Sequence, residues 1–421
     1  KCRMKKIKSL LCLGIYIYSG NILYAQTSLN SLIPTLYGND GVQLMEATSG
    51  FSHAPHFIDD SLVKLNNLSR AAEEVNITIP STGSGLHFVM DDISGDFIST
   101  SSPQGGTFSE YGATIGKGQL NFGLSYTYTN YTHYEGQNLD NVSLDLTHLD
   151  LRDPGVDFCI SGPPGECYEF ERDVVRVNTS IDIKSHVLMM YGSYGITDKM
   201  EVSILAPLMK TSLNANATAQ VVEHESAEHF EGTLHQFDPL GLNGDSSFSS
   251  VSGSHVGFGD IYARAKYQLV DRQALKISTL LDLRLPTGSA NNLQGINKIG
   301  LRPMIAASYD IPFSSGGIAL HTNIGYEINS GSLGQNEVDY LFGTEFYFLW
   351  DNNMLSLTAD IIGSQEVTHK DEIGDKNNDL ALGIKWKSEN EFYLYYGLKI
   401  ALDKEGLRAA TVHSFGLQVV Y

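Results

Sequence analysis

Charged side chains recur at every second position along much of the second half of the sequence. They carry both signs, and the set is Arg264, Lys266, Lys276, Asp282, Arg284, Arg302, Asp310, His321, Glu327, Glu345 and Lys399. Successive side chains of a strand point to opposite faces, so these residues are expected on one face, opposite apolar residues. In a barrel, such a wall of mixed charges could fill a narrow interior or line a polar path.

Motifs for metal binding are weak. His53 and His56 are followed by Asp59 and Asp60, but a zinc site needs three or four ligands, so a polar turn is the better interpretation. The acidic stretch 371–379 lacks the glutamate that completes an EF-hand calcium loop. We therefore predict no metal site and no cofactor.

The histidines on the alternating stretches do not form a recognisable catalytic set. His186, His321 and His413 lie on separate stretches, and none has a serine and a carboxylate at a spacing that would build a triad. The sequence also lacks G-x-S-x-G, H-E-x-x-H and P-loop motifs. We predict that the protein is not an enzyme.

Residues 1–25 have the features of a secretory signal peptide. Three lysines precede a short apolar run, and a small residue, Ala25, stands at the expected cleavage site. An exported chain meets an oxidising compartment. Cys159 and Cys167, on either side of a Gly-Pro-Pro turn, are therefore predicted to form a disulfide.

Composition excludes one class of partner and limits the fold. The formal net charge is −20, which argues against nucleic acid, because a phosphate backbone attracts Lys and Arg. Charged residues make up 18% of the chain, below the roughly 25% of soluble domains. After the signal peptide no run of about 20 apolar residues occurs, so no transmembrane helix is expected.

Period-2 alternation continues from residue 118 to the end of the chain. The alternating stretches run to about 10–15 residues, whereas globular strands usually have 5 or 6 and a tilted bilayer-spanning strand needs about 9–11. Short turns alternate with longer connections, as in outer-membrane barrels. We predict an all-β, transmembrane antiparallel barrel of 12 strands, at 118–133, 174–194, 199–213, 256–269, 274–286, 298–311, 317–328, 338–349, 354–365, 378–387, 391–402 and 409–421.

A count of 14 strands competes with this one. Residues 139–151 also alternate, and we interpret them as part of an extracellular hairpin. Counting them together with 107–116 as wall strands would give 14, because chain ends on the same side require an even number.

The chain ends on an alternating stretch with an aromatic last residue. Phe415, Leu417, Val419 and Tyr421 share one face, and this pattern resembles the C-terminal signal read by the outer-membrane assembly machinery. That machinery, outer-membrane lipids and lipopolysaccharide are therefore expected partners, and the outer membrane is the expected location.

Residues 26–117 lack long alternating stretches. Residues 56–74 can form one amphipathic helix, and the whole segment is expected in the barrel lumen or on the periplasmic side. The predicted organisation is therefore a signal peptide (1–25), this N-terminal segment and a barrel (118–421).

One stretch is apolar on both faces. Met189, Met190, Tyr191 and Tyr194 could form a wall of an apolar pocket or pack against the N-terminal helix. Packing is favoured, since an apolar helix face normally buries against an apolar partner.

Several stretches resemble a known family: 113–136, 193–208, 257–270 and 283–295. They contain a Tyr-Gly-x-Thr-Asp turn, a Gly-x-Gly-Asp strand start and a Leu-Pro-Thr-Gly strand end. These motifs are similar to those of the outer-membrane transporters of the "MetA-pathway of phenol degradation" family, which is similar in kind to hydrocarbon and fatty-acid uptake channels. The resemblance implies a barrel that passes small hydrophobic or aromatic solutes, and it supplies no ligand residues.

Two functions follow as hypotheses. The first is a transporter or channel for small hydrophobic or aromatic solutes. The alternative is a structural or surface-interaction barrel with a filled lumen, in which the acidic loops at 214–255 and 366–377 do the binding.

Overall fold

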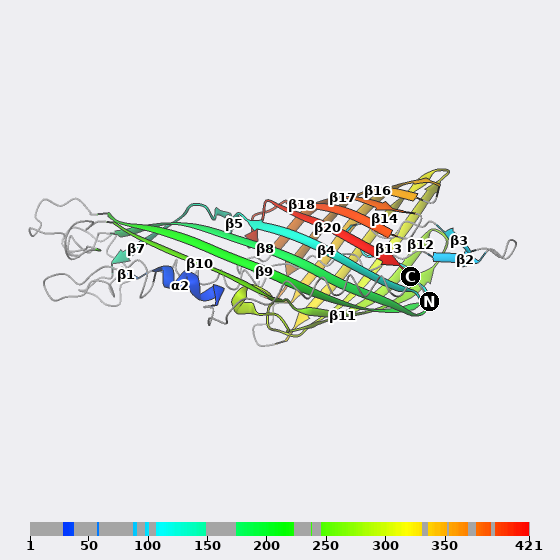
Figure 1. Cartoon of the computed structure of the whole chain (residues 1–421), viewed down its shortest axis with the longest axis horizontal. Helices are drawn as coiled ribbons and strands as arrows, with labels where there is room; N and C mark the ends of the chain where they lie inside the picture. Colours follow the sequence, from blue (N-terminus) through cyan, green and yellow to red (C-terminus); the bar gives the residue numbers. More distant parts are fainter. Residues whose placement is uncertain are drawn as a thin grey trace, which may run out of the picture.

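Long strands build most of the part of the protein that the structure describes (Figure 1). The structure is a computed structural model, and it describes residues 28–37, 57–58, 87–90, 97–100, 107–148, 174–222, 237, 246–330, 336–351, 353–368, 376–388 and 392–420.

Within the described residues, twelve strands close into one antiparallel barrel. They are β4 (Leu120–Tyr131), β8 (Val174–Thr197), β9 (Met200–Val222), β11 (Ile261–Asp271), β12 (Leu275–Leu285), β13 (Gly300–Phe313), β14 (Gly316–Asn329), β15 (Glu337–Trp350), β16 (Asn353–Glu366), β17 (Lys376–Lys387), β18 (Phe392–Ala401) and β20 (Thr411–Val420). The last strand closes the ring, because β20 pairs with β18 on one side and with β4 on the other. This closure confirms the predicted fold class.

The two ends of the barrel differ. Short connections such as 198–199, 314–315 and 351–352 gather at the end where β4 begins and β20 finishes, which we call the turn end. Longer connections gather at the opposite end, the loop end. Short turns on one side and long loops on the other are typical of outer-membrane barrels.

The outward faces of the strands carry an apolar belt. Phe122, Ile204, Ile305, Leu357 and Phe415 are each about half exposed on this surface. The period of two places polar residues on the inward face of the same strands. The belt supplies the surface that a hydrocarbon environment requires.

The competing count of 14 strands is wrong. Residues 107–116 do not join the wall. β7 (Val142–His148) pairs with the loop-end part of β8 and with β1 (Phe57–Ile58). This pairing places β7 in an extension beyond the ring.

The predicted loop over 214–255 is wrong in part. β9 continues to Val222. β10 (Ser246–Phe258) begins well before the strand predicted at 256–269 and pairs with the loop-end half of β9. β11 pairs with the turn-end half of β9. β10 and β11 therefore follow one another along the same edge of β9, with an interruption at Gly259 and Asp260.

The interruption explains two of the sequence motifs. The carboxylate of Asp260 accepts hydrogen bonds from the backbone N–H groups of Gly288 (2.9 Å) and Ile296 (3.0 Å). The Gly-x-Gly-Asp and Leu-Pro-Thr-Gly motifs therefore meet here, where the connection after β12 folds back over β10. This connection contains a short 3-10 helix, η3 (Ala290–Asn292).

β8 and β9 extend beyond the ring at the loop end (left in Figure 1), and in this extension the apolar face points inward and the polar face outward. Near the turn end, the outward residues are apolar and the inward ones include Glu201. Beyond the outward pair His186–Lys210, the outward residues are polar, and inward residues such as Ile183 and Leu213 are fully buried. The switch marks where the surroundings of the outer face change from apolar to aqueous.

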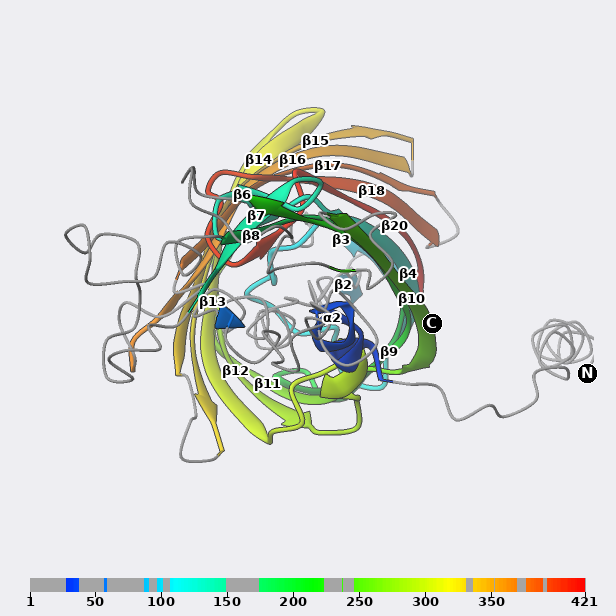
Figure 2. The ribbon, with the colours of Figure 1, turned by 90° about the vertical axis from the view of Figure 1, so that its left-hand side faces the viewer.

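A helix fills the inner side of this extension. α2 (Leu29–Tyr37) lies within the ring of strands when the barrel is seen from its loop end (Figure 2), and it buries Leu29, Leu32 and Leu36 in the main apolar cluster. The helix lies so close to β10 that a Cβ added to Gly253 would lie 2.8 Å from Leu32 Cδ1. Most of the helix predicted at 56–74 lies outside the described residues, although Phe57–Ile58 is a strand.

Smaller elements complete the structure. β2 (His87–Met90) and β3 (Phe97–Thr100) form a hairpin. β5 (His133–Tyr134) pairs with β6 (Gln137–Asn138) and β19 (Leu407–Arg408). Within the described residues, no helix has the length and apolar character needed to cross a membrane.

Four sequence-based predictions lie outside the described residues and stay predictions. They concern the signal peptide (1–25), the disulfide between Cys159 and Cys167, the His53/His56 turn and the terminal aromatic Tyr421.

Candidate functional site

A buried segment without regular secondary structure crosses the lumen. Residues 107–115, called the luminal segment from here on, immediately precede β4, and every one of them is buried. The segment contacts strands from β16 through β14, β13 and β12 to β9, so it lies against a large part of the inner wall.

The wall supplies hydrogen-bond partners for the backbone of this segment. The Glu110 N–H donates to Asn323 Oδ1 (2.8 Å), and Asn323 Nδ2 donates back to the Glu110 carbonyl (3.0 Å). The Gly112 N–H donates to Ser308 Oγ (3.0 Å), and Ser278 Oγ donates to the Gly112 carbonyl (2.6 Å). Buried backbone groups need partners, and here polar side chains of β12, β13 and β14 replace a sheet ladder.

Further contacts lie in the middle of the segment and at both of its ends. The Tyr111 hydroxyl donates to Asp310 Oδ2 (2.7 Å), and the Ile115 N–H donates to Glu201 Oε2 (2.7 Å). Thr107 and Thr358 share a hydroxyl–hydroxyl hydrogen bond of 2.9 Å. The segment is therefore tied from β16 to β9.

One arginine joins the segment to the charged wall. Arg264 on β11 donates through Nε and Nη2 to the two carboxylate oxygens of Asp282 (2.6 and 2.8 Å), and its Nη1 forms an ion pair with Glu110. Arg302 also contacts Asp282 (2.8 Å), and Lys266 Nζ lies 3.7 Å from both Glu110 and Glu201. Buried ions are tolerated only when they are paired, so this network holds the segment as long as every partner stays in place.

A second network surrounds His321. Ser308 Oγ lies 3.0 Å from His321 Nδ1, and His321 Nε2 lies 3.7 Å from Glu345, which also receives Lys385 Nζ at 2.9 Å. The sequence spacing of Ser308, His321 and Glu345 did not indicate this grouping, because strand pairing brings the three residues together across β13, β14 and β15. Ser308 is buried and accepts the Gly112 N–H, so the arrangement serves as an anchor for the segment.

The predicted lumen-lining residues all lie on inward-facing positions, and each has a charged or polar partner. Eight are buried: Arg264, Lys266, Asp282, Arg284, Asp310, His321, Glu345 and Lys399. The other three are partly buried: Lys276, Arg302 and Glu327. Further pairs join Arg284 to Glu327, Lys399 to Asp379 and Lys276 to Asp271. Opposite charges therefore neutralise one another around the luminal segment.

The predicted apolar pocket is not a single surface. Met189 and Tyr191 point inward and pack with Leu205 in a small buried cluster, whereas Tyr194 is 48% exposed on the outer face. Met190 shares the outer face with Tyr194, because the strand alternates. The four residues therefore do not line one pocket.

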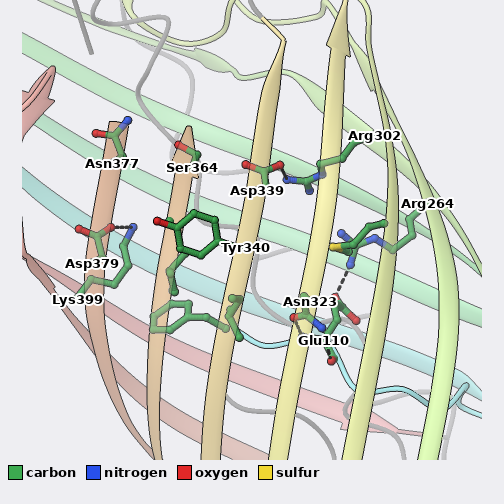
Figure 3. A pocket seen from close by; sticks show the side chains of 15 residues that line it. Glu110, Arg264, Arg302, Asn323, Asp339, Tyr340, Ser364, Asn377, Asp379 and Lys399 are labelled. Atoms are coloured by element: carbon green, nitrogen blue, oxygen red, sulfur yellow. Dashed lines mark hydrogen bonds and ion pairs between the residues drawn. The ribbon is translucent and has the colours of Figure 1, made fainter. Parts of the chain in front are cut away.

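A cavity of about 120 Å³ lies on the loop-end side of the luminal segment (Figure 3). Phe108 and Glu110 of the segment line it together with side chains near the loop ends of β13 to β18. Its apolar side consists of Phe108, Met304, Leu341 and Ile362, and its polar side includes Arg264, Arg302, Asn323 and Lys399. The arrangement suits a small solute with an apolar body and a polar group.

Sequence reasoning missed the wall residues that hold the segment. Ser278, Ser308 and Asn323 fall at inward positions of alternating stretches, so a search for small polar residues on the inward face would have found them. Glu110 could not be found in this way, because its stretch has no periodicity.

Comparison with known proteins identifies a family. The model of the family described as "Putative MetA-pathway of phenol degradation" matches residues 191–407, just over half of the chain. No curated protein sequence matches.

Solved structures include several similar barrels at low sequence identity. An outer membrane channel from Pseudomonas putida is 12% identical, covers 73% of this chain and 97% of its own, and gives a TM-score of 0.38. A mutant of the TodX monoaromatic hydrocarbon channel is 12% identical, with coverage of 75% and 95% and a TM-score of 0.32. A Pseudomonas aeruginosa FadL homologue is 9% identical, with coverage of 74% and 91% and a TM-score of 0.32.

Proposed function

This chain belongs to the "Putative MetA-pathway of phenol degradation" family, and we propose that it is an outer-membrane barrel that passes small hydrophobic or aromatic solutes. In this proposal, the luminal segment closes the interior at rest and moves to let a solute through. The barrel is inserted by the outer-membrane assembly machinery and is surrounded by lipid and lipopolysaccharide.

The observation that carries the proposal is the cavity against the luminal segment. Its apolar side is formed partly by Phe108, which belongs to the segment, and partly by Met304 and Leu341, which belong to the wall. An engineered apolar cavity of ~150 Å³ binds benzene, so the cavity is of the size of one small ring. A solute there touches the segment directly.

The attachment of the segment suits a closure that can open. Hydrogen bonds and ion pairs hold residues 107–115, and the segment contributes no strand to the ring. Each such hydrogen bond contributes a net ~1 kcal/mol. The segment can therefore rearrange without breaking the ladder that keeps the barrel closed.

The rival function, a structural barrel with a filled lumen, is supported by a different observation. Ion pairs such as Arg264–Asp282 and Lys385–Glu345 fill the interior around the segment. Under that proposal the segment is a permanent part of the packing, and solutes do not cross.

A reversible crosslink separates the two. Thr107→Cys with Thr358→Cys replaces two hydroxyls that lie 2.9 Å apart, so a disulfide there would fix the segment to β16. We expect proteoliposomes containing the reduced variant to take up phenol as the wild type does, oxidation to stop the uptake, and reduction to restore it. The single variants under oxidation are the controls.

Two other outcomes would contradict the proposal. Absence of uptake by the correctly folded wild type and by both forms of the variant would favour the structural barrel. Undiminished uptake by the oxidised form would mean that solutes do not pass the luminal segment.

A further inference from the structure

The luminal segment contributes a single acidic side chain to the interior. Glu110 is the only Asp or Glu within residues 107–115, and it lines the cavity together with its partner Arg264 (Figure 3). We propose that the cavity binds a small carboxylate with an apolar body, and that the ligand carboxylate replaces Glu110 on Arg264 and so releases the segment. This inference rests on the proposed function and names its substrate class.

The geometry around Arg264 divides its donors between fixed and movable partners. Nε and Nη2 are held by Asp282 on β12, at 2.6 and 2.8 Å, and these contacts do not depend on the segment. Nη1 faces Glu110. Movement of the segment therefore takes the Glu110 carboxylate away from Arg264 at the wall of the cavity.

The loss of Glu110 as a partner favours a ligand that carries a carboxylate. Arg264 is 3% exposed, and a buried guanidinium whose donors lose their partner is strongly disfavoured. A neutral hydrocarbon supplies no carboxylate in place of Glu110. A carboxylate then replaces a carboxylate next to Arg264, so the charge that faces the guanidinium is unchanged, and its two oxygens suit a guanidinium.

The rest of the cavity fits the other parts of such a ligand. Phe108, Met304 and Leu341 offer an apolar surface for its body. Arg302 and Lys399 also line the cavity, where Asp339 (3.2 Å) and Asp379 (3.3 Å) neutralise them. Those two carboxylates belong to β15 and β17, so they stay when the segment moves. A cavity of about 120 Å³ limits the body to one ring or a short chain.

Competition between the ligand and Glu110 gives a direct test. Benzoate is the probe, and benzamide is a neutral probe of nearly the same shape. We expect the detergent-solubilised full chain to bind benzoate in preference to benzamide. Glu110→Gln, which weakens the internal competitor, should raise benzoate affinity by at least about tenfold, because a hydrogen bond to a charged group contributes ~1.5–3 kcal/mol. Its benzamide affinity should not change.

Two further variants complete the experiment. Asp271→Asn removes an exposed carboxylate at the end of the same strand as Arg264, and it should leave benzoate affinity as in the wild type. Arg264→Gln should abolish the preference for benzoate. If Arg264→Gln fails to fold, the comparison between Glu110→Gln and Asp271→Asn still decides the question.

Equal binding of benzoate and benzamide would overturn the inference, and so would an unchanged benzoate affinity in Glu110→Gln. The phenol uptake measured with the cysteine variant distinguishes this failure from failure of the proposed function. If phenol passes but benzoate binding lacks the expected pattern, the channel function is supported and the carboxylate site is contradicted. If benzoate binds as expected but neither solute crosses the barrel, the carboxylate site is supported and the channel function is contradicted.

Discussion

A valine in place of Gly112 should open the lumen. Gly112 packs tightly against the wall, because a Cβ built there would lie 2.2 Å from the carbonyl oxygen of Lys276. Ordinary contact begins at 3.4 Å. Since the obstacle is strand backbone, which cannot turn aside, the segment has to retreat.

The size of the effect follows from the hydrogen bonds that this retreat breaks. The bonds from Gly112 to Ser308 and from Ser278 to Gly112 are broken, and the neighbouring bond between Tyr111 and Asp310 is strained. At a net ~1 kcal/mol each, the two broken bonds destabilise the closed state by ~2 kcal/mol, and the strained bond adds to this. The ratio of open to closed segment should then rise by at least about thirtyfold.

Planar-bilayer conductance of Gly112→Val and of the wild type measures this shift. The control is Gly192→Val, since the nearest atom to a Cβ there is 3.8 Å away, which is ordinary contact. We expect more frequent openings and faster hydrogen exchange in residues 107–115 for Gly112→Val alone. A folded Gly112→Val protein with wild-type conductance and exchange would refute the argument that this segment closes the lumen.

Three further predictions concern other parts of the molecule. Phe415→Lys places a charge on the outward apolar face of β20, where Phe415 is 53% exposed. It should lower the free energy of unfolding in lipid vesicles by up to ~2–4 kcal/mol, the value for a position near the bilayer midplane. Phe415→Leu is the control, and equal stability of the two variants would contradict the lipid-facing assignment. Leu36→Asp buries a carboxylate in the apolar cluster of the extension and should undock α2, which hydrogen exchange of residues 29–37 measures; protection equal to that of the wild type would contradict the packing. The pKa of Asp145 lies below its ordinary value of 3.8, because the side chain of Arg176 donates hydrogen bonds to it. The stabilisation by this pair is therefore fully present above that ordinary value and is lost as the pH falls through the lowered one. Because both side chains are exposed, Asp145→Asn should leave the unfolding temperature at pH 7 within error, and a large drop would show that the pair is more strongly coupled than its exposure implies.

The strands could be predicted from the sequence because each residue of a wall strand sees one of two environments. Alternation of apolar and polar residues fixed the twelve strands of the ring to within a few residues for most of them, from Leu120 onward. The inward position of charges such as Asp282 and Glu345 followed from the same period. The extension of β9 was missed because residues 214–220 alternate between alanine and polar residues. Those small side chains give the pattern little hydrophobic contrast.

The candidate site could be predicted only in part. Its wall residues follow from alternation, but the partner of each charge does not, because pairing depends on which strands are neighbours in the ring. Arg264 and Asp282 meet across one strand pair, whereas Arg264 and Glu110 are separated by 154 residues.

By itself, the sequence determined that the chain builds long two-faced strands, since a local period of two needs no knowledge of distant residues. It also determined that the inner face is charged with both signs. Only the tertiary structure decided that residues 107–115 cross the lumen, that His321 lies beside Ser308 and Glu345, and that the interior charges are paired. The reason is physical: closing the ring brings inward side chains from distant strands to within hydrogen-bonding distance of one irregular segment, and no local pattern records which of them will meet.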